Sequence, residues 1–194
     1  MAVANSLKYL ILSTSPRIGG NSDTAARYVE TLLKAKGDGV FLNTSRKKIN
    51  PCLGCNLCSR DGRCVQKDDM AEIYELLPQI NYLVIASPIY AMGLCAQAKA
   101  IIDRLQPYWA QKYLLKQSEM QQKRRKGLYL LTAGTNFNTV FTGAEITLKY
   151  LNNVLEVEEF RIVGFKNLEE KGEIKKDPNN FNRILEAINQ MGVS

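Results

Sequence analysis

Four of the chain's five cysteines stand close together, in the segment CLGCNLCSRDGRC. Their spacing is C-x2-C-x2-C-x5-C, and the residues are Cys52, Cys55, Cys58 and Cys64. Three thiolates at three-residue intervals can hold one face of a metal cluster, and a fourth a few residues later can complete the ligand set. Four thiolates can also bind a structural zinc ion, pair as disulfides, or remain free. The spacing indicates sulfur chemistry and leaves its kind open.

The chain contains no histidine. This composition excludes Ser-His-Asp and Cys-His nucleophile systems, zinc or haem held by histidine, and acid–base catalysis by imidazole. The chemistry must then come from a bound cofactor or from cysteine, carboxylate, lysine, arginine, serine or tyrosine side chains. If a cofactor carries the chemistry, we expect no catalytic side chain. The formal net charge of +7 favours anionic partners, although scattered solvated lysines commonly produce such a balance.

Five apolar segments have the character of strands buried in a parallel sheet. They are residues 7–14, 40–44, 82–87, 128–132 and 157–164. Helical periodicity follows each of them, and the predicted helices lie between Asn21 and Gly37 and near residues 68–78, 94–105, 144–155 and 181–191. Asp69 and Glu72 have the spacing of a capping box at the start of the second helix. The alternation predicts an α/β fold with a parallel sheet covered on both faces.

The length of 194 residues fits one domain, which we expect to span 1–194 with a cysteine-rich loop at 45–67. The N-terminal segment lacks the features of a signal peptide, and no stretch approaches the ~20 apolar residues of a membrane span. We expect a cytoplasmic protein with no membrane partner. Cysteines in that compartment stay reduced, so disulfides are disfavoured. The polar segment 106–126 is predicted to be an additional helix, with KRRK at 123–126 as its solvated end.

The loop after the first strand combines hydroxyl groups, an arginine and two glycines directly before a helix. Its candidate anion ligands are Ser15, Arg17, Asn21 and Ser22. Free N–H groups and the helix dipole favour a phosphate at such a place. The loop matches neither G-x-G-x-x-G nor the P-loop pattern, so dinucleotide and nucleoside-triphosphate sites lose their main support. A polar turn that caps the helix and binds nothing is the alternative.

Two further loops follow the third and fourth predicted strands, and parallel strands present their carboxyl ends at one edge of the sheet. The first offers an aromatic ring and a thioether beside a glycine, in the residues Pro88, Ile89, Tyr90, Met92 and Gly93. The second offers small residues and includes Thr132 and Gly134. Together the loops suit a flat heteroaromatic ring, with Gly93 allowing close backbone approach. Ordinary packing is the alternative for Tyr90 and Met92 taken singly.

The stretches STSPRIGGNSD, PCLGC and SPIYAMGL followed by AQAKAIIDR, together with the strand alternation, resemble the flavodoxin-like NADPH-dependent FMN reductases over nearly the whole chain. The resemblance implies a three-layer sandwich with a five-stranded parallel sheet in the order 2-1-3-4-5. It implies FMN, with the phosphate at the first loop and the isoalloxazine against residues 88–93 and the Gly134 loop. The first loop is longer than that of true flavodoxins, which favours the reductase branch.

The cysteine spacing is similar to that of the iron-sulfur flavoproteins, a branch of the same group. There a 4Fe-4S cluster lies near the flavin of a neighbouring subunit, and the resemblance implies that Cys52, Cys55, Cys58 and Cys64 are the ligands. A zinc ion and empty thiols remain open as alternatives. The fifth thiol, Cys95, begins a predicted helix and is expected in the core.

We therefore expect an FMN-dependent oxidoreductase and electron-transfer flavoprotein that exchanges electrons with ferredoxin or a small molecule. An NAD(P)H-dependent FMN or quinone reductase without a cluster is the alternative. A homodimer or homotetramer is expected, because the ring slot is open on one side. The rival from another class is a zinc-stabilised nucleic-acid-binding protein. Neither a recognition helix nor clear aromatic platforms support it, and we expect no nucleic-acid partner.

Overall fold

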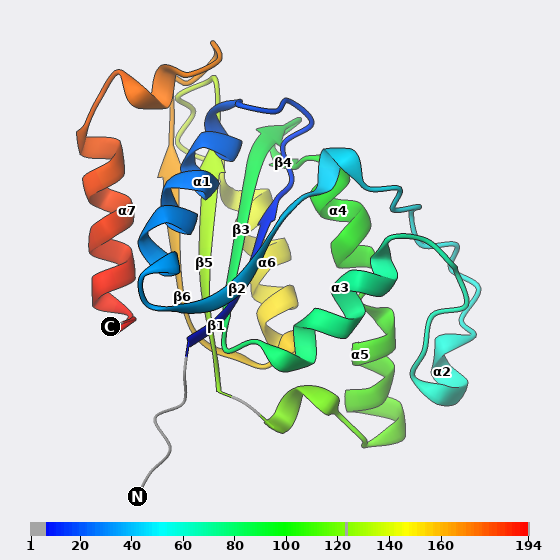
Figure 1. The fold of residues 1–194 in the computed structure, drawn as a ribbon. Coiled ribbons are helices and arrows are strands. Elements are labelled where there is room, and N and C mark those ends of the chain that lie inside the picture. The colour runs from blue at the N-terminus through cyan, green and yellow to red at the C-terminus, as the bar shows by residue number, and fades with distance from the viewer. Residues whose placement is uncertain (1–6, 123, 194) are drawn as a thin grey trace, which may run out of the picture.

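The computed structural model describes residues 7–122 and 124–193, which form a twisted parallel sheet between two layers of helices (Figure 1). The strands run in the order β2-β1-β3-β5-β6, and the short β4 pairs antiparallel with β3. Their bounds are β1 (Leu7–Ser13), β2 (Gly37–Asn43), β3 (Tyr82–Tyr90), β4 (Gly93–Leu94), β5 (Arg125–Thr132) and β6 (Val157–Phe165). With β4 set aside, this is the predicted order 2-1-3-4-5, and the predicted α/β sandwich is confirmed.

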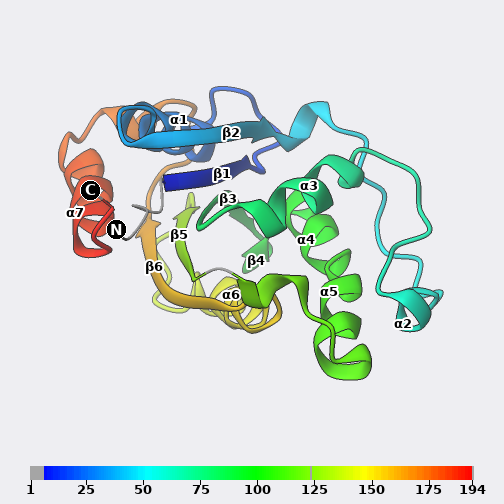
Figure 2. The same ribbon diagram turned by 60° about the horizontal axis from the view of Figure 1, so that its bottom comes forward.

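Helices cover both faces of the sheet (Figure 2). One face carries α1 (Asn21–Lys34) and α7 (Asn179–Gln190). The other face carries α3 (Met70–Leu76), α4 (Ala96–Asp103), α5 (Gln106–Ala110) and α6 (Thr142–Leu155). The single turn α2 (Cys58–Asp61) projects from the rest of the fold at one side. The shorter pieces are 3-10 turns at Thr44–Arg46, Leu77–Gln79, Glu119–Gln122 and Glu173–Lys175, and a π-helical turn at Gln111–Leu115.

The alternation of side chains along β1 divides the core into two halves. Tyr9 and Ile11 pack in the half that α1 and α7 cover, whereas Leu10 and Leu12 pack in the half that α3 to α6 cover. All four side chains are buried. Burying an aliphatic or aromatic side chain of this size contributes about 1.5–3 kcal/mol to folding. The double burial explains why the central strands have continuous apolar sequences.

Two local predictions are wrong. The described part of the KRRK run, residues 124–126, is no solvated helix end, because Arg125 and Lys126 begin β5 and the Arg125 side chain is buried, donating to the carbonyls of Met120 and Pro78. Residue 123 lies outside the described residues. The capping box at α3 does not form either. The Asp69 carboxylate accepts from the backbone N–H of Lys48 at 2.6 Å instead.

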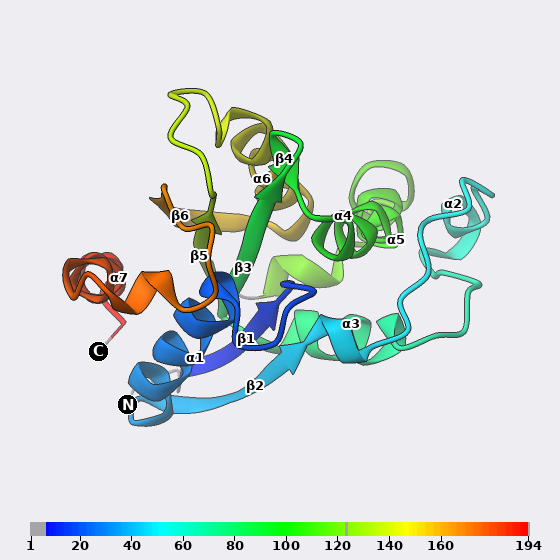
Figure 3. The same ribbon diagram turned by 90° about the horizontal axis from the view of Figure 1, so that it is seen from above.

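The carboxyl ends of the parallel strands meet at one edge of the sheet, seen from above in Figure 3. The β1–α1 loop lies at this edge, while the cysteine-rich segment extends away from it past α4 and α5. Among the helices within residues 7–122 and 124–193, none is both long and apolar enough to cross a bilayer.

Candidate functional site

The loop between β1 and α1 folds around the side chain of Asp23, which is fully buried. Its carboxylate accepts hydrogen bonds from Ser13 Oγ at 2.7 Å, Gly19 N–H at 2.9 Å, Asn43 Nδ2 at 2.9 Å and Arg27 Nε at 3.1 Å. Burial opposes ionisation, but these hydrogen bonds outweigh it and hold the pKa of Asp23 below its ordinary value. The charged Asp23 therefore fixes the β1–α1 loop from its buried side, and the solvent-facing side of the loop stays open.

A small cavity of about 30 Å³ lies against this loop. Its lining residues are Ser15, Arg17, Gly20, Asn21, Ser22, Pro88, Ile89, Tyr90, Thr132, Gly134 and Leu168. All the predicted cofactor residues except Met92 and Gly93 are therefore brought together from three separate loops. Ser22 Oγ and Thr132 Oγ1 lie 2.7 Å apart and join the first turn of α1 to the end of β5. The cavity is small and lined mostly by polar groups, so it suits one compact polar group.

The predicted anion ligands differ in how available they are. Ser15 is buried, and its hydroxyl bonds to the backbone of Arg17 at 3.0 Å and 3.2 Å, while the Arg17 side chain is exposed. The Asn21 side chain is committed to the loop after β6. It donates to the carbonyls of Leu168 and Glu170 and accepts from the N–H of Ile174. Asn21 thus contributes its backbone to the α1 N-terminus, and its side chain holds a wall of the cavity.

The turn between β3 and β4 carries backbone strain. Ala91 and Met92 both have positive φ, at 46° and 64°. Side chains other than glycine rarely adopt this region, and each such residue costs of the order of 1–3 kcal/mol. The turn presents Tyr90 and Met92 outward, and these side chains are 44% and 41% exposed. Gly93, by contrast, has no positive φ, so its predicted importance depends on close approach by a ligand rather than on the turn itself.

Sequence reasoning missed two residues of this edge. Asp23 was not singled out as a residue that fixes the loop, and Leu168 lies on a loop that no motif singled out. An acidic residue directly after the two glycines of the loop was a signal for Asp23. No sequence signal was available for Leu168, because the contact of its loop with α1 joins residues far apart in the chain.

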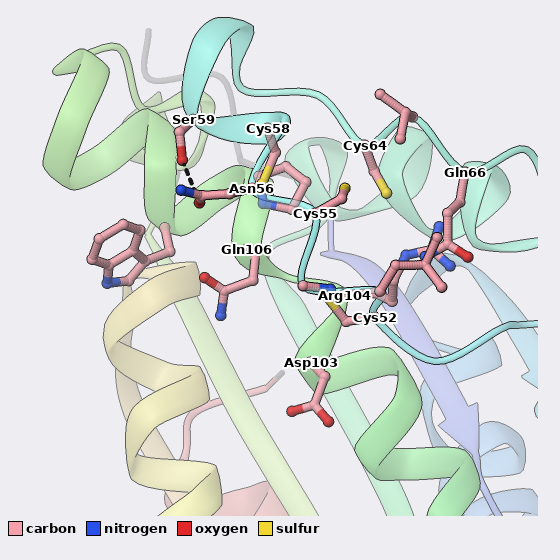
Figure 4. A pocket seen from close by; sticks show the side chains of 15 residues that line it. Cys52, Cys55, Asn56, Cys58, Ser59, Cys64, Gln66, Asp103, Arg104 and Gln106 are labelled. Atoms are coloured by element: carbon pink, nitrogen blue, oxygen red, sulfur yellow. Dashed lines mark hydrogen bonds between the residues drawn. The ribbon is translucent and has the colours of Figure 1, made fainter.

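The four clustered cysteines line a second cavity, of about 360 Å³ (Figure 4). Its wall is completed by Arg104, Pro107 and Trp109 from the α4–α5 region and by the apolar side chains of Leu53 and Val65. Cys52 and Cys55 are exposed, and Cys58 and Cys64 are partly buried. Cys95 is buried at the start of α4, as predicted, and its thiol donates to the Thr14 carbonyl at 3.1 Å.

Two positive-φ glycines shape the segment. Gly54 has φ +63°, and Gly62 ends α2 at φ +73°. A Cβ on Gly62 would lie 2.6 Å from Gln111 Cγ, and the carbonyl of Gly62 accepts from the Gln111 amide at 3.1 Å. The turn that carries Cys58 is thereby fixed against the helical segment after α5.

A buried ion pair closes the neck of the cysteine segment. Arg104 donates to both oxygens of Asp68, at 2.8 Å and 3.1 Å, and each side chain is only 1% exposed. Asp68 also accepts from Asn50 N–H, and Arg104 donates to the Asn50 carbonyl at 3.0 Å. Burial opposes both charges, but their mutual hydrogen bonds raise the pKa of Arg104 and lower that of Asp68. Residues 50 and 68 are thus held together, and the cysteines lie in the loop between them.

The Nε–H group of Arg104 is buried without a hydrogen-bond partner among the described residues. Buried donors are nearly always satisfied, so this one, on a residue that lines the cavity, is an exception among the described residues. Burial, followed by the charges of Cys64, Cys52 and Cys55, raises the pKa of Cys58. The four sulfur atoms are therefore close enough to interact electrostatically in the absence of a cation between them.

The described parts of the chain contain no group of three Cys, Asp or Glu side chains placed to hold a single metal ion. The two cavities share no lining residue, so the four cysteines and the β1–α1 loop belong to separate candidate sites.

A parallel α/β sandwich with a polar loop at the N-terminus of α1 and exposed Tyr90 and Met92 side chains at its carboxyl edge is typical of flavin-binding redox proteins with a flavodoxin-like fold. The chain belongs to the NADPH-dependent FMN reductase family, whose model matches residues 7–140. The family prediction is therefore confirmed, and with it the class of FMN-dependent oxidoreductases.

Several relatives carry the name iron-sulfur flavoprotein. One from Methanocaldococcus jannaschii is 28% identical over 159 residues, which cover 81% of this chain and 76% of the relative. Another from the same organism is 32% identical over 161 residues, covering 81% and 75%. Among solved structures, an FMN-dependent NADH-azoreductase from Bacillus anthracis in complex with FMN matches with a TM-score of 0.68 at 17% identity, covering 95% of this chain and 99% of that one. The last likeness shows the fold alone.

Proposed function

We propose that the chain binds FMN at the carboxyl edge of the sheet and transfers electrons between a two-electron and a one-electron partner. The observation that carries this proposal is the convergence of Ser15, Arg17, Ser22 and Thr132 on one small polar cavity at the N-terminus of α1. Backbone N–H groups there, with the helix dipole, suit a dianionic phosphate. Membership of the FMN reductase family supports the same ligand.

The cavity is small, so the phosphate would occupy it and the isoalloxazine ring would lie outside it, along the exposed side chains of Tyr90 and Met92. Pro88, Ile89 and Gly93 would support one edge of the ring, and Gly134 the other. A ring so placed is open to solvent on one side. This openness supports a homodimer or homotetramer in which a second chain covers it, and it gives NAD(P)H or another small molecule a route to the ring.

FMN supplies the hydride and single-electron chemistry when bound. The chain's own residues bind and orient the cofactor: Asp23 keeps the loop closed, Arg17 offers a cation to the phosphate, and Ser22 and Thr132 offer hydroxyl groups. No side chain is required to move a proton, which is consistent with a chain that has no histidine.

The second part of the proposal is that Cys52, Cys55, Cys58 and Cys64 hold a 4Fe-4S cluster. Three observations support it: all four line one cavity, a buried arginine with an orphaned donor lies beside them, and the relatives are named iron-sulfur flavoproteins. A cluster would exchange single electrons with a carrier such as ferredoxin. Transfer between cluster and flavin is proposed to occur between subunits, as the resemblance to the iron-sulfur flavoproteins implies.

The flavin proposal is tested by binding of FMN to the Arg17→Gln variant. Loss of a charged hydrogen bond to phosphate is expected to weaken binding about tenfold, measured by quenching of FMN fluorescence. Arg124→Gln is the matched control, since it makes the same charge change at the 91% exposed Arg124, next to the amino end of β5. Equal FMN affinity in the two variants would overturn the assignment of Arg17.

The cluster proposal is tested on protein purified without oxygen, by visible absorption with iron and acid-labile sulfide assays. We expect flavin bands, a broad iron-sulfur absorbance and equal amounts of iron and sulfide. Flavin bands without iron would favour the NAD(P)H-dependent reductase that has empty thiols. Anaerobic NADPH addition then separates the donors, because rapid bleaching of the flavin identifies NADPH, and reduction only by ferredoxin identifies the carrier.

A further inference from the structure

The buried guanidinium of Arg104 has one N–H donor, Nε–H, that its ion pair with Asp68 leaves without a partner among the described residues. Arg104 directs its terminal nitrogens to Asp68 and to the Asn50 carbonyl, whereas its Nε–H has no partner in the described residues. An arginine has five N–H donors in a fixed planar arrangement, so the contacts to Asp68 also fix the direction of Nε–H. The side chain cannot turn to satisfy this donor without breaking the ion pair.

The position of Arg104 relates this donor to the cysteines. Arg104 lines the cavity together with Cys52, Cys55, Cys58 and Cys64, as Figure 4 shows. Arg60 and Arg63, on the same loop, are exposed, so solvent screens their charges. Arg104 therefore differs from Arg60 and Arg63: it is buried, its ion pair with Asp68 holds it in place, and its Nε–H has no partner among the described residues.

We infer that Arg104 sets the reduction potential of the proposed cluster in two ways. Its Nε–H donates to a cluster sulfur, and its positive charge is buried, so that solvent does not screen it. This inference rests on the proposed 4Fe-4S site. A one-electron reduction adds a negative charge to the cluster, and a buried cation or an N–H···S hydrogen bond stabilises that added charge. Asp68 acts as a positioning residue, because it orients the guanidinium and offsets part of its charge.

Variants of Arg104 and Asp68 test the inference, because they are expected to shift the midpoint potential in opposite directions. Arg104→Gln removes a positive charge and the donor, so the midpoint potential is expected to fall. Asp68→Asn removes the compensating negative charge while leaving the cation, so the potential is expected to rise. A residue pair that served only to close the neck of the loop would give no such opposite shifts, because both variants would break the same ion pair. The control is Arg60→Gln, an equal charge change at an exposed position, for which a much smaller shift is expected.

The experiment is a dye-mediated redox titration of the full-length protein, with the reduced cluster followed by electron paramagnetic resonance and iron content measured for each variant. Arg104→Lys is included because it keeps the charge and removes Nε–H, and its potential is expected between those of wild type and Arg104→Gln. Should Arg104→Gln fail to retain iron, Asp68→Asn and Arg104→Lys still decide the question. Shifts of one sign in the Arg104 and Asp68 variants, or shifts no larger than that of Arg60→Gln, overturn the inference. Wild-type protein without iron would instead overturn the proposed cluster.

Discussion

The carboxylate of Asp23 accepts a hydrogen bond from the backbone N–H of Gly19 at 2.9 Å, across the loop that joins β1 to α1. Gly19 has φ +70°, a conformation that a side chain would strain, so the loop turns sharply at that point. The same carboxylate accepts from Ser13 at the end of β1 and from Asn43 at the end of β2. One buried acid therefore fixes the anion cradle to two strands of the sheet.

Asp23→Asn is expected to weaken FMN binding about tenfold, the effect of losing roughly one charged hydrogen bond from a preorganised loop. An amide offers one acceptor oxygen, and its NH2 group would face donors from Gly19 or Ser13. Removal of a negative charge near the phosphate acts in the opposite direction, but Arg27 already offsets that charge. Loss of loop order therefore dominates. Fluorescence titration with FMN measures the effect.

The matched control is Asp38→Asn, the same change at an exposed position of β2. FMN affinity in this variant is expected to equal that of wild type. Tighter FMN binding by Asp23→Asn would show that charge repulsion outweighs loop order, and would contradict the role given to Asp23.

Stability is expected to fall in acid, in a way that Asp23 and Asp68 control. Burial would raise the pKa of each, but hydrogen bonds hold both pKa values below the ordinary value of an aspartate. A folded-state pKa below the unfolded one, about 3.9, gives stability that is complete above that pH and is lost as pH falls through the folded pKa. Each group contributes a slope of up to about 1.4 kcal/mol per pH unit in that window.

Urea unfolding between pH 3 and pH 7 tests this expectation. The free energy of unfolding of the wild type should be nearly constant above about pH 5 and should decrease below about pH 4. Asp68→Asn is expected to be less stable at pH 7 and to show a shallower decrease in acid. A slope equal to that of wild type in both Asp23→Asn and Asp68→Asn would contradict the lowered pKa values.

Much of the fold follows from sequence, because strands buried on both faces produce continuous apolar runs. Each predicted strand lies within three residues of an observed one at either end. The end of β3 was not predictable in this way. Its extension to Tyr90 depends on antiparallel pairing with the two residues of β4, and so short a pairing leaves no periodicity in the sequence. Arg125 was misread because its buried charge is satisfied by carbonyls of residues 78 and 120, contacts that only the tertiary fold creates.

The site shows the same division between local and long-range information. The residue types of the β1–α1 loop predicted a polar cradle, and the loops of β3 and β5 lie beside it because parallel strands end at one edge. The sequence offered no means to see that the Asn21 amide would hold the loop at 168–174 rather than face the cavity. For the cysteines, spacing indicated the ligand set, but the Arg104–Asp68 pair is a contact between segments 36 residues apart.

Two glycines near the proposed ring site are expected to respond differently to alanine. A Cβ on Gly143 would lie 2.5 Å from the Met92 carbonyl oxygen, so Gly143→Ala must separate α6 from the β3–β4 turn. Such overpacking costs about 1–3 kcal/mol of stability. A Cβ on Gly93 would meet nothing closer than the Tyr90 carbonyl at 4.0 Å, so Gly93→Ala is expected to fold as well as wild type.

FMN titration completes this comparison. Gly93→Ala is expected to bind FMN more weakly despite its unchanged stability, because the added methyl group would occupy the space along which the ring approaches the backbone. Thermal unfolding measures the first property and fluorescence quenching the second. Normal FMN affinity in Gly93→Ala would remove residue 93 from the ring site, whereas an unaltered melting temperature in Gly143→Ala would contradict the close contact with Met92.

The five thiols are expected to react in two classes with a thiol reagent such as 5,5′-dithiobis(2-nitrobenzoic acid). Cys52 and Cys55 are exposed and Cys58 and Cys64 partly buried, while Cys95 is 1% exposed and bonded to the Thr14 carbonyl. In protein stripped of iron, the four loop thiols should react quickly and Cys95 only after unfolding. In protein purified without oxygen, cluster ligation should protect the four as well, since a coordinated thiolate is unavailable to the reagent. Fast reaction of the four thiols in iron-containing protein would show that the iron is bound elsewhere, and Cys95→Ser should leave the fast phase unchanged in every preparation.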